Sequence, residues 1–148
     1  MEQRQPYDVA VLDPTDTEAV RRCFPVFAFL RPHLGEETFV RRVQAQSRQG
    51  YVIAYIELHG DVSAAAGYRL ADFLAWGKVL YIDDLITHPE KKNRGLGGAL
   101  MDWLLEQARQ QGCDEVHLDT GFQRHDAHRL YLNKGLTLSC HHMSTKLT

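Results

Sequence analysis

A glycine-rich turn between an apolar strand and an amphipathic helix constrains this fold more than any other feature. The turn covers residues 93–98 with the sequence NRGLGG, and it follows an apolar run over residues 78–87 that Pro89 stops. Apolar residues then recur at helical spacing over residues 96–108. Glycines let a ligand approach the backbone closely, and the free N–H groups of a first helical turn suit phosphate oxygens. The junction therefore predicts an α/β fold with an anion-binding turn.

The rest of the chain predicts a single α/β domain over residues 1–148. Alternating runs and turn signals predict strands over residues 7–12, 51–58, 62–69, 78–87, 115–120 and 138–147. Helical spacing and capping signals predict helices over residues 16–24, 36–49, 96–111 and 126–133. Pro25 is expected to interrupt the first helix, and residues 71–77 are expected to form a loop.

Composition predicts a cytoplasmic protein that binds neither nucleic acid nor membranes. The formal net charge is -2, and no apolar run approaches the roughly 20 residues that span a bilayer. The N-terminus lacks an apolar signal-peptide core. Three cysteines form no Cys-x-x-Cys pair, and His125 and His128 lack a third ligand in the sequence, so no metal is expected.

A dinucleotide-binding fold and a kinase-type P-loop are the alternatives for a glycine-rich turn. Asp119 lies about where a ribose-binding acid would follow in a dinucleotide fold. However, residues 87–94 separate the glycines from the strand, and Leu100 stands where the third glycine of G-x-G-x-x-G belongs. No Gly-Lys-Ser/Thr follows, which argues against a P-loop. A nucleotide-dependent oxidoreductase therefore stays the less favoured alternative.

The segment LYIDDLITHPEKKNRGLGGALMDWLLEQA resembles the acyl-CoA-binding core of the GNAT superfamily of N-acetyltransferases. The signature Gln/Arg-x-x-Gly-x-Gly/Ala of that family reads Lys92-x-x-Gly95-x-Gly97 here, and the lysine keeps a cation at the first position. The segment AHRLYLNKGL is similar to a second block of the family, although Arg124 stands where an asparagine is common. The resemblance implies a mixed central sheet with helices on both faces.

The resemblance also implies that acetyl-CoA is the co-substrate. The exposed backbone of the strand before the glycine turn would hold the pantetheine arm, and the turn would hold the pyrophosphate. Arg124 and His128 would border the adenosine end and the phosphates. The implied cofactor-binding residues are Leu85, Ile86, Thr87, Lys92, Asn93, Arg94, Gly95, Leu96, Gly97, Gly98, Arg124 and His128.

Three residues are candidates for the chemistry. The resemblance matches Tyr131 to the tyrosine that protonates the leaving CoA thiolate in many members. Asp83 and Asp84 interrupt an apolar strand, where a buried acid is costly unless it has a partner or a role. They resemble the Glu-Asp pair of spermidine/spermine-type acetyltransferases, with Asp83 as the base. The alternative is that one of them caps a helix or pairs with an arginine.

These residues together predict an N-acetyltransferase that moves an acetyl group to a primary amine by direct attack. The aspartate pair favours a small cationic acceptor, either a polyamine or an amine that resembles an amino acid. A non-catalytic acyl-CoA-binding sensor of the same fold is the main alternative. Members of the family often form homodimers, so a homodimer is an expected alternative to a monomer.

Overall fold

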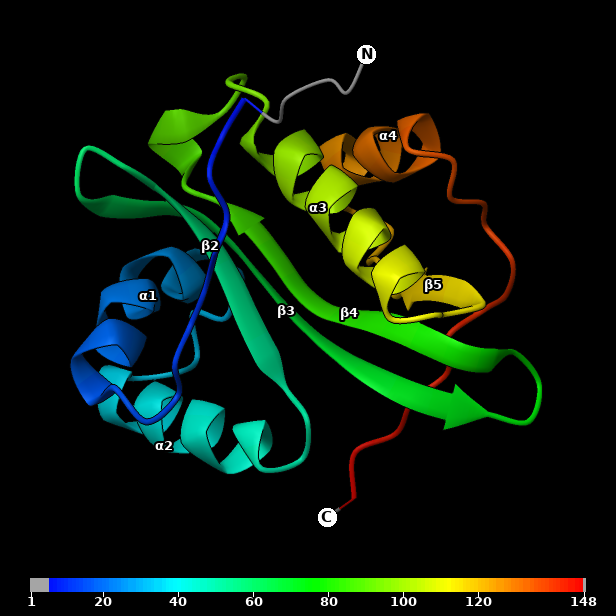
Figure 1. Cartoon of the computed structure of the whole chain (residues 1–148), viewed down its shortest axis with the longest axis horizontal. Helices are drawn as coiled ribbons and strands as arrows, with labels where there is room; N and C mark the ends of the chain where they lie inside the picture. The colour runs from blue at the N-terminus through cyan, green and yellow to red at the C-terminus, as the bar shows by residue number, and fades with distance from the viewer. Residues whose placement is uncertain (1–5, 148) are drawn as a thin grey trace. The chain divides into compact units, whose positions relative to one another are not determined.

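The computed structural model describes residues 6–147, and the chain divides into two compact units after Leu118. The first unit contains a five-stranded sheet in the order β1-β2-β3-β4-β5 (Figure 1). β4 and β5 pair in parallel, and all other neighbours pair antiparallel. The sheet is therefore mixed, as the family resemblance implied.

The elements agree with most of the predicted ranges. The strands are β1 Ala10–Val11, β2 Val52–Leu58, β3 Asp61–Phe73, β4 Gly77–Thr87 and β5 Glu115–Leu118. The helices are α1 Thr17–Leu30, α2 Glu36–Ser47, the 3-10 helix η1 Pro89–Lys91, α3 Leu96–Gln110 and α4 His125–Asn133.

Helix α1 continues through Pro25, so the predicted interruption is wrong. The side chain of Asp16 caps its start by accepting a hydrogen bond from the N–H of Ala19 at 3.1 Å. Val26 and Phe27 follow the proline on the inner face and are buried. A proline inside a helix costs about 3 kcal/mol because it removes one hydrogen bond and crowds the preceding turn. Burial of the inner face over four turns offsets that cost.

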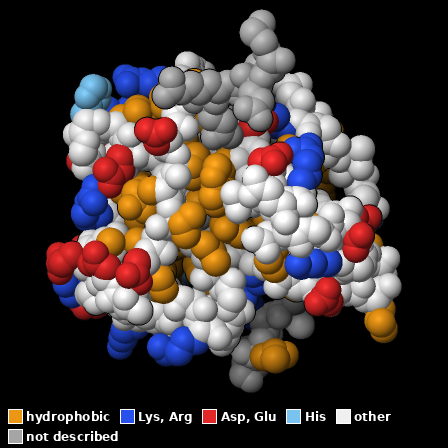
Figure 2. Space-filling model, in the orientation of Figure 1, with side chains coloured by type: hydrophobic (Ala, Val, Ile, Leu, Met, Phe, Trp, Pro, Cys, Tyr) orange, Lys and Arg blue, Asp and Glu red, His pale blue; other side chains and the backbone are white. Residues whose placement is uncertain are grey.

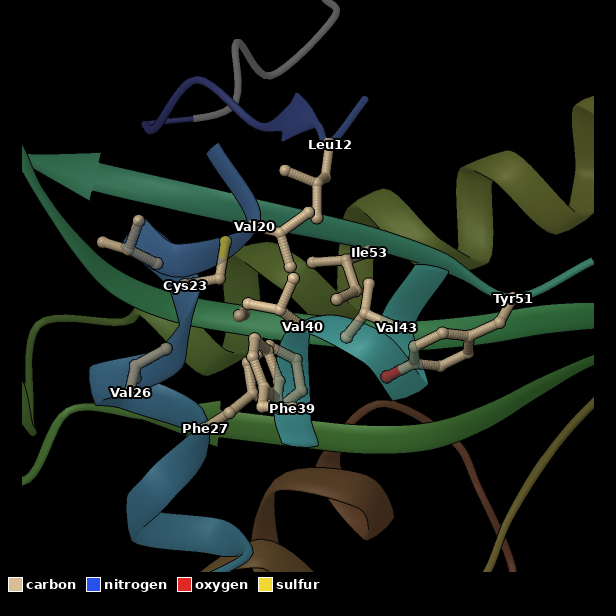
Figure 3. Close-up of a cluster of buried hydrophobic side chains, with 12 residues drawn as sticks. Leu12, Val20, Cys23, Val26, Phe27, Phe39, Val40, Val43, Tyr51 and Ile53 are labelled. Atoms are coloured by element: carbon tan, nitrogen blue, oxygen red, sulfur yellow. The ribbon is translucent and has the colours of Figure 1, made fainter. Parts of the chain in front are cut away.

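The hydrophobic core joins α1 and α2 to one face of the sheet (Figure 3). The rings of Phe27 and Phe39 lie 5.2 Å apart, and both helices pack on residues such as Ala65 of β3. Successive strand residues point to opposite faces. Tyr68, three residues after Ala65, accordingly lies on the other face, where its ring meets Trp103 of α3 at 6.0 Å. Helices thus cover both faces of the sheet in the first unit.

The hairpin of β3 and β4 extends four residues further than predicted. Residues 71–73 and Gly77 pair within the sheet instead of forming a loop. The turn is closed by Gly77 at φ +75°, a conformation that glycine adopts without strain. The Trp76 ring packs against Phe73 at 5.1 Å and His117 at 4.1 Å. These ring contacts stabilise the tip of the hairpin, for which the sequence predicted a loop.

Three of the strand predictions need correction. β1 covers two residues instead of 7–12, and β5 ends at Leu118 instead of residue 120. Residues 138–147 form no strand in the described part of the second unit. A strand needs a partner for its N–H and C=O groups. The described residues of that unit contain no other strand that could pair with them.

The surface in Figure 2 shows hydrophobic side chains near the middle of the view, over β2 and beside α3, with charged side chains around them. A cavity of about 310 Å³ is lined by Val52, Tyr68, Leu70 and Gln107, together with Gly50 and Gln111. It lies at the C-terminal end of α3, whereas the glycine turn lies at the other end of that helix. No helix of the described chain has the length and apolarity needed to cross a membrane.

Candidate active site

The glycine turn presents backbone N–H groups at the start of α3. Asn93 has φ 64° and Gly95, the N-cap residue, has φ 76°. The first N–H groups of an α-helix have no acceptor within the helix. In the described structure no side chain caps α3, so the amides of Leu96, Gly97 and Gly98 stay available to a ligand. Such a helix start favours phosphate oxygens through its N–H groups and its dipole.

Burial of α3 orients these amides. Leu96, Leu100 and Leu104 are each at most 1% exposed, which fixes one face of the helix on the sheet. Lys92 and Arg94, in contrast, lie exposed in the turn and add positive charge beside it. The turn therefore combines a rigid row of donors with two free cations, which fits the pyrophosphate of a nucleotide cofactor.

Tyr7 ties the N-terminal segment to the turn. Its hydroxyl donates a hydrogen bond of 2.6 Å to the carbonyl oxygen of Arg94. Arg94 lies between Asn93 and Gly95, the two residues with positive φ, so this bond anchors the part of the turn where the backbone changes direction. The sequence offered no signal for this contact, because the two residues are 87 positions apart.

One edge of β4 is unpaired next to the glycine turn. The parallel pairing of β4 with β5 stops at Ile82 and Leu118. Within residues 6–147, no strand pairs with β4 on that side after Ile82, although β3 pairs on the other side as far as Thr87. Residues 83–87 therefore expose backbone groups along the edge that leads to η1 and the turn. This is the segment for which pantetheine binding was predicted.

A β-bulge at Asp83 places both candidate carboxylates on the same side of the sheet. Tyr68 pairs with Ile82, and the preceding residue Gly67 pairs with Asp84, so Asp83 is the extra residue. A bulge shifts the alternation of side chains by one position. Ile82 shares the α3 face with Tyr68, whereas Asp84 turns to the face that carries α1 and α2. The sequence shows two acids but not this change of face.

Asp83 forms a bidentate ion pair with Arg69. Arg69 donates from Nε to both carboxylate oxygens at 3.1 Å and from Nη2 to Oδ2 at 2.6 Å. These hydrogen bonds raise the pKa of the Arg69 guanidinium. Gln46 accepts from the same Nη2 at 3.4 Å, and the Tyr51 ring lies 5.4 Å from the guanidinium carbon. The Asp83 carboxylate is therefore fixed in orientation by the Arg69 fork.

Asp84 is held by Arg31 and Tyr51. Arg31 donates from Nε to Oδ1 at 3.0 Å, and its Nη2 also reaches the carbonyl oxygen of Asp83 at 3.1 Å. The Tyr51 hydroxyl donates to Oδ2 at 2.5 Å. Burial, and next the negative charge of Asp84, raise the pKa of the Tyr51 phenol, which keeps it a donor. The sequence left open that one of the two aspartates pairs with an arginine. In the structure both of them do.

Arg31, Tyr51 and Arg69 were missed in the sequence. Arg69 does carry a signal, since it lies at the end of an apolar alternating strand and faces the core side. Arg31 follows directly after the apolar residues of α1, where an arginine can reach across to a neighbouring strand. Neither signal predicts which acid each arginine pairs with, because the bulge decides which face of the sheet the two aspartates lie on.

The second unit carries the remaining candidates. Tyr131 lies on α4, and burial raises the pKa of its phenol, an effect that the nearby Arg124 partly offsets. Arg124 is the N-cap residue of α4 and is exposed, and His128 Nε2 lies 2.8 Å from the carbonyl oxygen of Gly121. A phenol with a raised pKa stays protonated near neutral pH, as a proton donor must.

His88, the residue between β4 and η1, is engaged in local contacts. Its Nδ1 accepts a hydrogen bond of 3.1 Å from the N–H of Glu90 and so caps η1. The ring packs edge-on against Phe29 at 4.8 Å. These contacts give His88 a structural role where β4 turns into η1.

Comparison with known proteins adds independent findings. The model of the acetyltransferase (GNAT) family matches residues 17–136. The chain is 31% identical over 126 residues to the uncharacterized N-acetyltransferase YhdJ of Bacillus subtilis, covering 84% of this chain and 89% of that protein. It is 38% identical over 88 residues to the aminoalkylphosphonate N-acetyltransferase of Salmonella typhimurium, covering 60% of this chain and 51% of that protein.

The fold also matches solved structures. The aminoglycoside N-acetyltransferase AAC(6')-Iy in complex with CoA superposes with a TM-score of 0.80 at 12% identity, covering 99% of this chain and 98% of that chain. At this identity the likeness concerns the fold alone.

Proposed function

This chain belongs to the GNAT family of acetyltransferases, and we propose that it moves an acetyl group from acetyl-CoA to the primary amine of a small molecule by direct attack. The single observation that carries this proposal is the row of free amides from Leu96 to Gly98 next to the unpaired edge of β4. The row suits a pyrophosphate, and the edge suits an extended amide-containing arm. A relative named for aminoalkylphosphonates supports a small-molecule acceptor.

The proposed chemistry needs a neutral amine and a protonated leaving group. The amine nitrogen bonds to the thioester carbon, the C–S bond breaks, and its electron pair leaves on the sulfur. We assign to Tyr131 the donation of a proton to the leaving thiolate. Its raised pKa keeps the proton on the phenol until the C–S bond breaks. We assign the amine's proton to Asp83 or Asp84, directly or through water.

Tyr131→Phe is expected to lower kcat by about a hundredfold, because general acid catalysis contributes about that much or more. The affinity for acetyl-CoA should change little, since the variant removes one hydroxyl. Steady-state kinetics with thiol detection measure both effects. Tyr55→Phe is the matched control, because Tyr55 lies on β2 and its phenol pKa is also raised by burial. Equal turnover of Tyr131→Phe and the parent protein would contradict the acid role.

Asp83→Asn is expected to change the acid limb of the pH profile of kcat/KM, because an amide cannot accept the amine's proton. The side chain keeps its volume, so the bulge itself should persist. Asp61→Asn, at the exposed first residue of β3, is the control for the loss of one carboxylate. A profile identical to that of the parent protein would remove Asp83 as the base and leave Asp84 as the candidate.

The proposed function is tested by two assays in sequence. Thermal melting with acetyl-CoA, CoA and NADPH should show stabilisation by the first two compounds alone. Release of CoA thiol from acetyl-CoA should then depend on an added primary amine. Stabilisation by acetyl-CoA without thiol release from any amine would indicate an acyl-CoA-binding sensor. Stabilisation by NADPH in place of CoA would indicate an oxidoreductase.

A further inference from the structure

The charges at the β4 bulge cancel. Two aspartates and two arginines form the cluster, and each acid has its own guanidinium partner: Arg31 Nη2 lies 2.8 Å from Asp84 and Arg69 Nη2 lies 2.6 Å from Asp83. A polyamine would add positive charge beside two arginines, and like charges at this range repel. An acceptor with one positive and one negative group would leave the cluster neutral and would find a partner for each of its charges.

The two arginines retain donors for such a negative group. A guanidinium has five N–H donors in a planar fork. Arg31 uses Nε and Nη2 for its bonds, and so does Arg69. Among the hydrogen bonds of residues 6–147, none uses Nη1 of either side chain. Carboxylates, phosphates and phosphonates are the groups that these remaining donors bind best.

The position of Arg31 suits an anchor at the mouth of a site. Its side chain is 40% exposed, whereas the side chain of its partner Asp84 is 14% exposed. The guanidinium therefore forms the solvent side of the ion pair. Its bond to the carbonyl oxygen of Asp83 keeps it beside the unpaired edge of β4. An anion bound there would leave the amine a few bond lengths from that edge and from both carboxylates.

We infer that the acceptor is a zwitterionic small amine, with a carboxylate or a phosphonate within a few atoms of the amino group. Arg31, assisted by Arg69, holds the negative group and so determines acceptor specificity. This inference rests on the proposed acetyl transfer and names its substrate class. Of the two acceptors that the sequence favoured, it selects the amine that resembles an amino acid over the polyamine, because each aspartate already has an arginine partner.

The test compares primary amines of similar length that differ in the second group. Propylamine has none, 3-aminopropanoate has a carboxylate, 2-aminoethylphosphonate has a phosphonate, and 1,3-diaminopropane has a second cation. At least one of the two anionic acceptors should exceed propylamine in kcat/KM by about tenfold or more, as expected for a charge-assisted hydrogen bond. The two anionic compounds differ in their negative group, so their ratio identifies which anion is preferred. The diamine should not exceed propylamine.

The Arg31→Met variant tests the anchor. In this variant, kcat/KM for the better anionic acceptor should fall toward the value for propylamine, so that the ratio of the two values approaches one. The main cause should be a higher KM for the anionic acceptor. Arg31→Lys should recover part of the ratio, since it restores the charge without the fork. Arg41→Met is the matched control, because Arg41 is exposed on α2 and bonds to Thr38. That control should keep the parent ratio, and thermal melting verifies that each variant is folded.

Binding measured apart from turnover separates the two proposals. Calorimetric titration of the CoA-bound protein with the better anionic acceptor should show an affinity that Arg31→Met lowers about tenfold. Preference for the diamine, or a ratio unchanged in Arg31→Met, would overturn the zwitterion inference while acetyl transfer stands. Binding of the anionic acceptor with no thiol release would instead remove the proposed catalysis and keep the binding specificity.

Discussion

Gly95→Ala is expected to lower the affinity for acetyl-CoA by about tenfold or more. Gly95 has φ +76°, and an L-residue in that conformation costs about 1–2 kcal/mol. The chain can avoid this cost by rebuilding the turn, which moves the amides of Leu96 and Gly97 away from the pyrophosphate. Each lost bond to a charged oxygen weakens binding by roughly 1.5–3 kcal/mol. Titration calorimetry with acetyl-CoA measures the effect.

Gly112→Ala is the matched control for this loss of affinity. Gly112 has φ +71°, and an added Cβ would find no atom within 4 Å at either glycine. The two substitutions should therefore lower the melting temperature by similar amounts. Gly112 follows the opposite end of α3, so its variant should bind acetyl-CoA like the parent protein. Equal affinities of the two variants would show that the glycine turn does not bind the cofactor.

The elements that the sequence predicts well are those in which local pattern and burial agree. α3 was predicted because its apolar positions repeat at helical spacing, and most of these positions are buried in the structure. The glycine turn was predicted because glycines between a strand and a helix let the backbone turn and approach a ligand, and Gly95 has positive φ there. The family match over residues 17–136 confirms the superfamily that those same residues indicated.

The elements that the sequence misses depend on partners far along the chain. Pro25 stays in α1 because the helix buries its inner face against β-strands that come later in the sequence. The ion pair of Arg31 with Asp84 joins residues 53 positions apart, and it forms because the bulge turns Asp84 toward α1. Residues 138–147 alternate like a strand, yet alternation alone cannot provide the partner that a strand needs.

Gly67→Ala is expected to lower the free energy of unfolding by about 3 kcal/mol, the upper end of the usual cost of overpacking a core. An added Cβ at this position would lie 2.4 Å from Cζ of Tyr51 and still closer to its hydroxyl. The Tyr51 ring must then leave its site, and its hydrogen bond to Asp84 is lost with it. Turnover should fall as well, since Asp84 loses a neutral donor that holds its orientation. Denaturant unfolding and steady-state kinetics measure the two effects.

Two further variants make this prediction specific to the contact with Tyr51. Gly35→Ala should cost only about 0.5–1 kcal/mol, the N-cap preference for glycine over alanine, because an added Cβ there meets no atom within 4 Å and φ is -83°. In a Tyr51→Ala background, Gly67→Ala should cost far less than in the parent protein, since the ring that blocks the new methyl group is gone. If Gly67→Ala costs the same free energy of unfolding in both backgrounds, the contact with the Tyr51 ring is not the cause. The cost would then come from the backbone conformation of Gly67. The difference between the two costs is the coupling energy of Gly67 and Tyr51. It measures how strongly the missing side chain at Gly67 is needed to place the Tyr51 hydroxyl against Asp84.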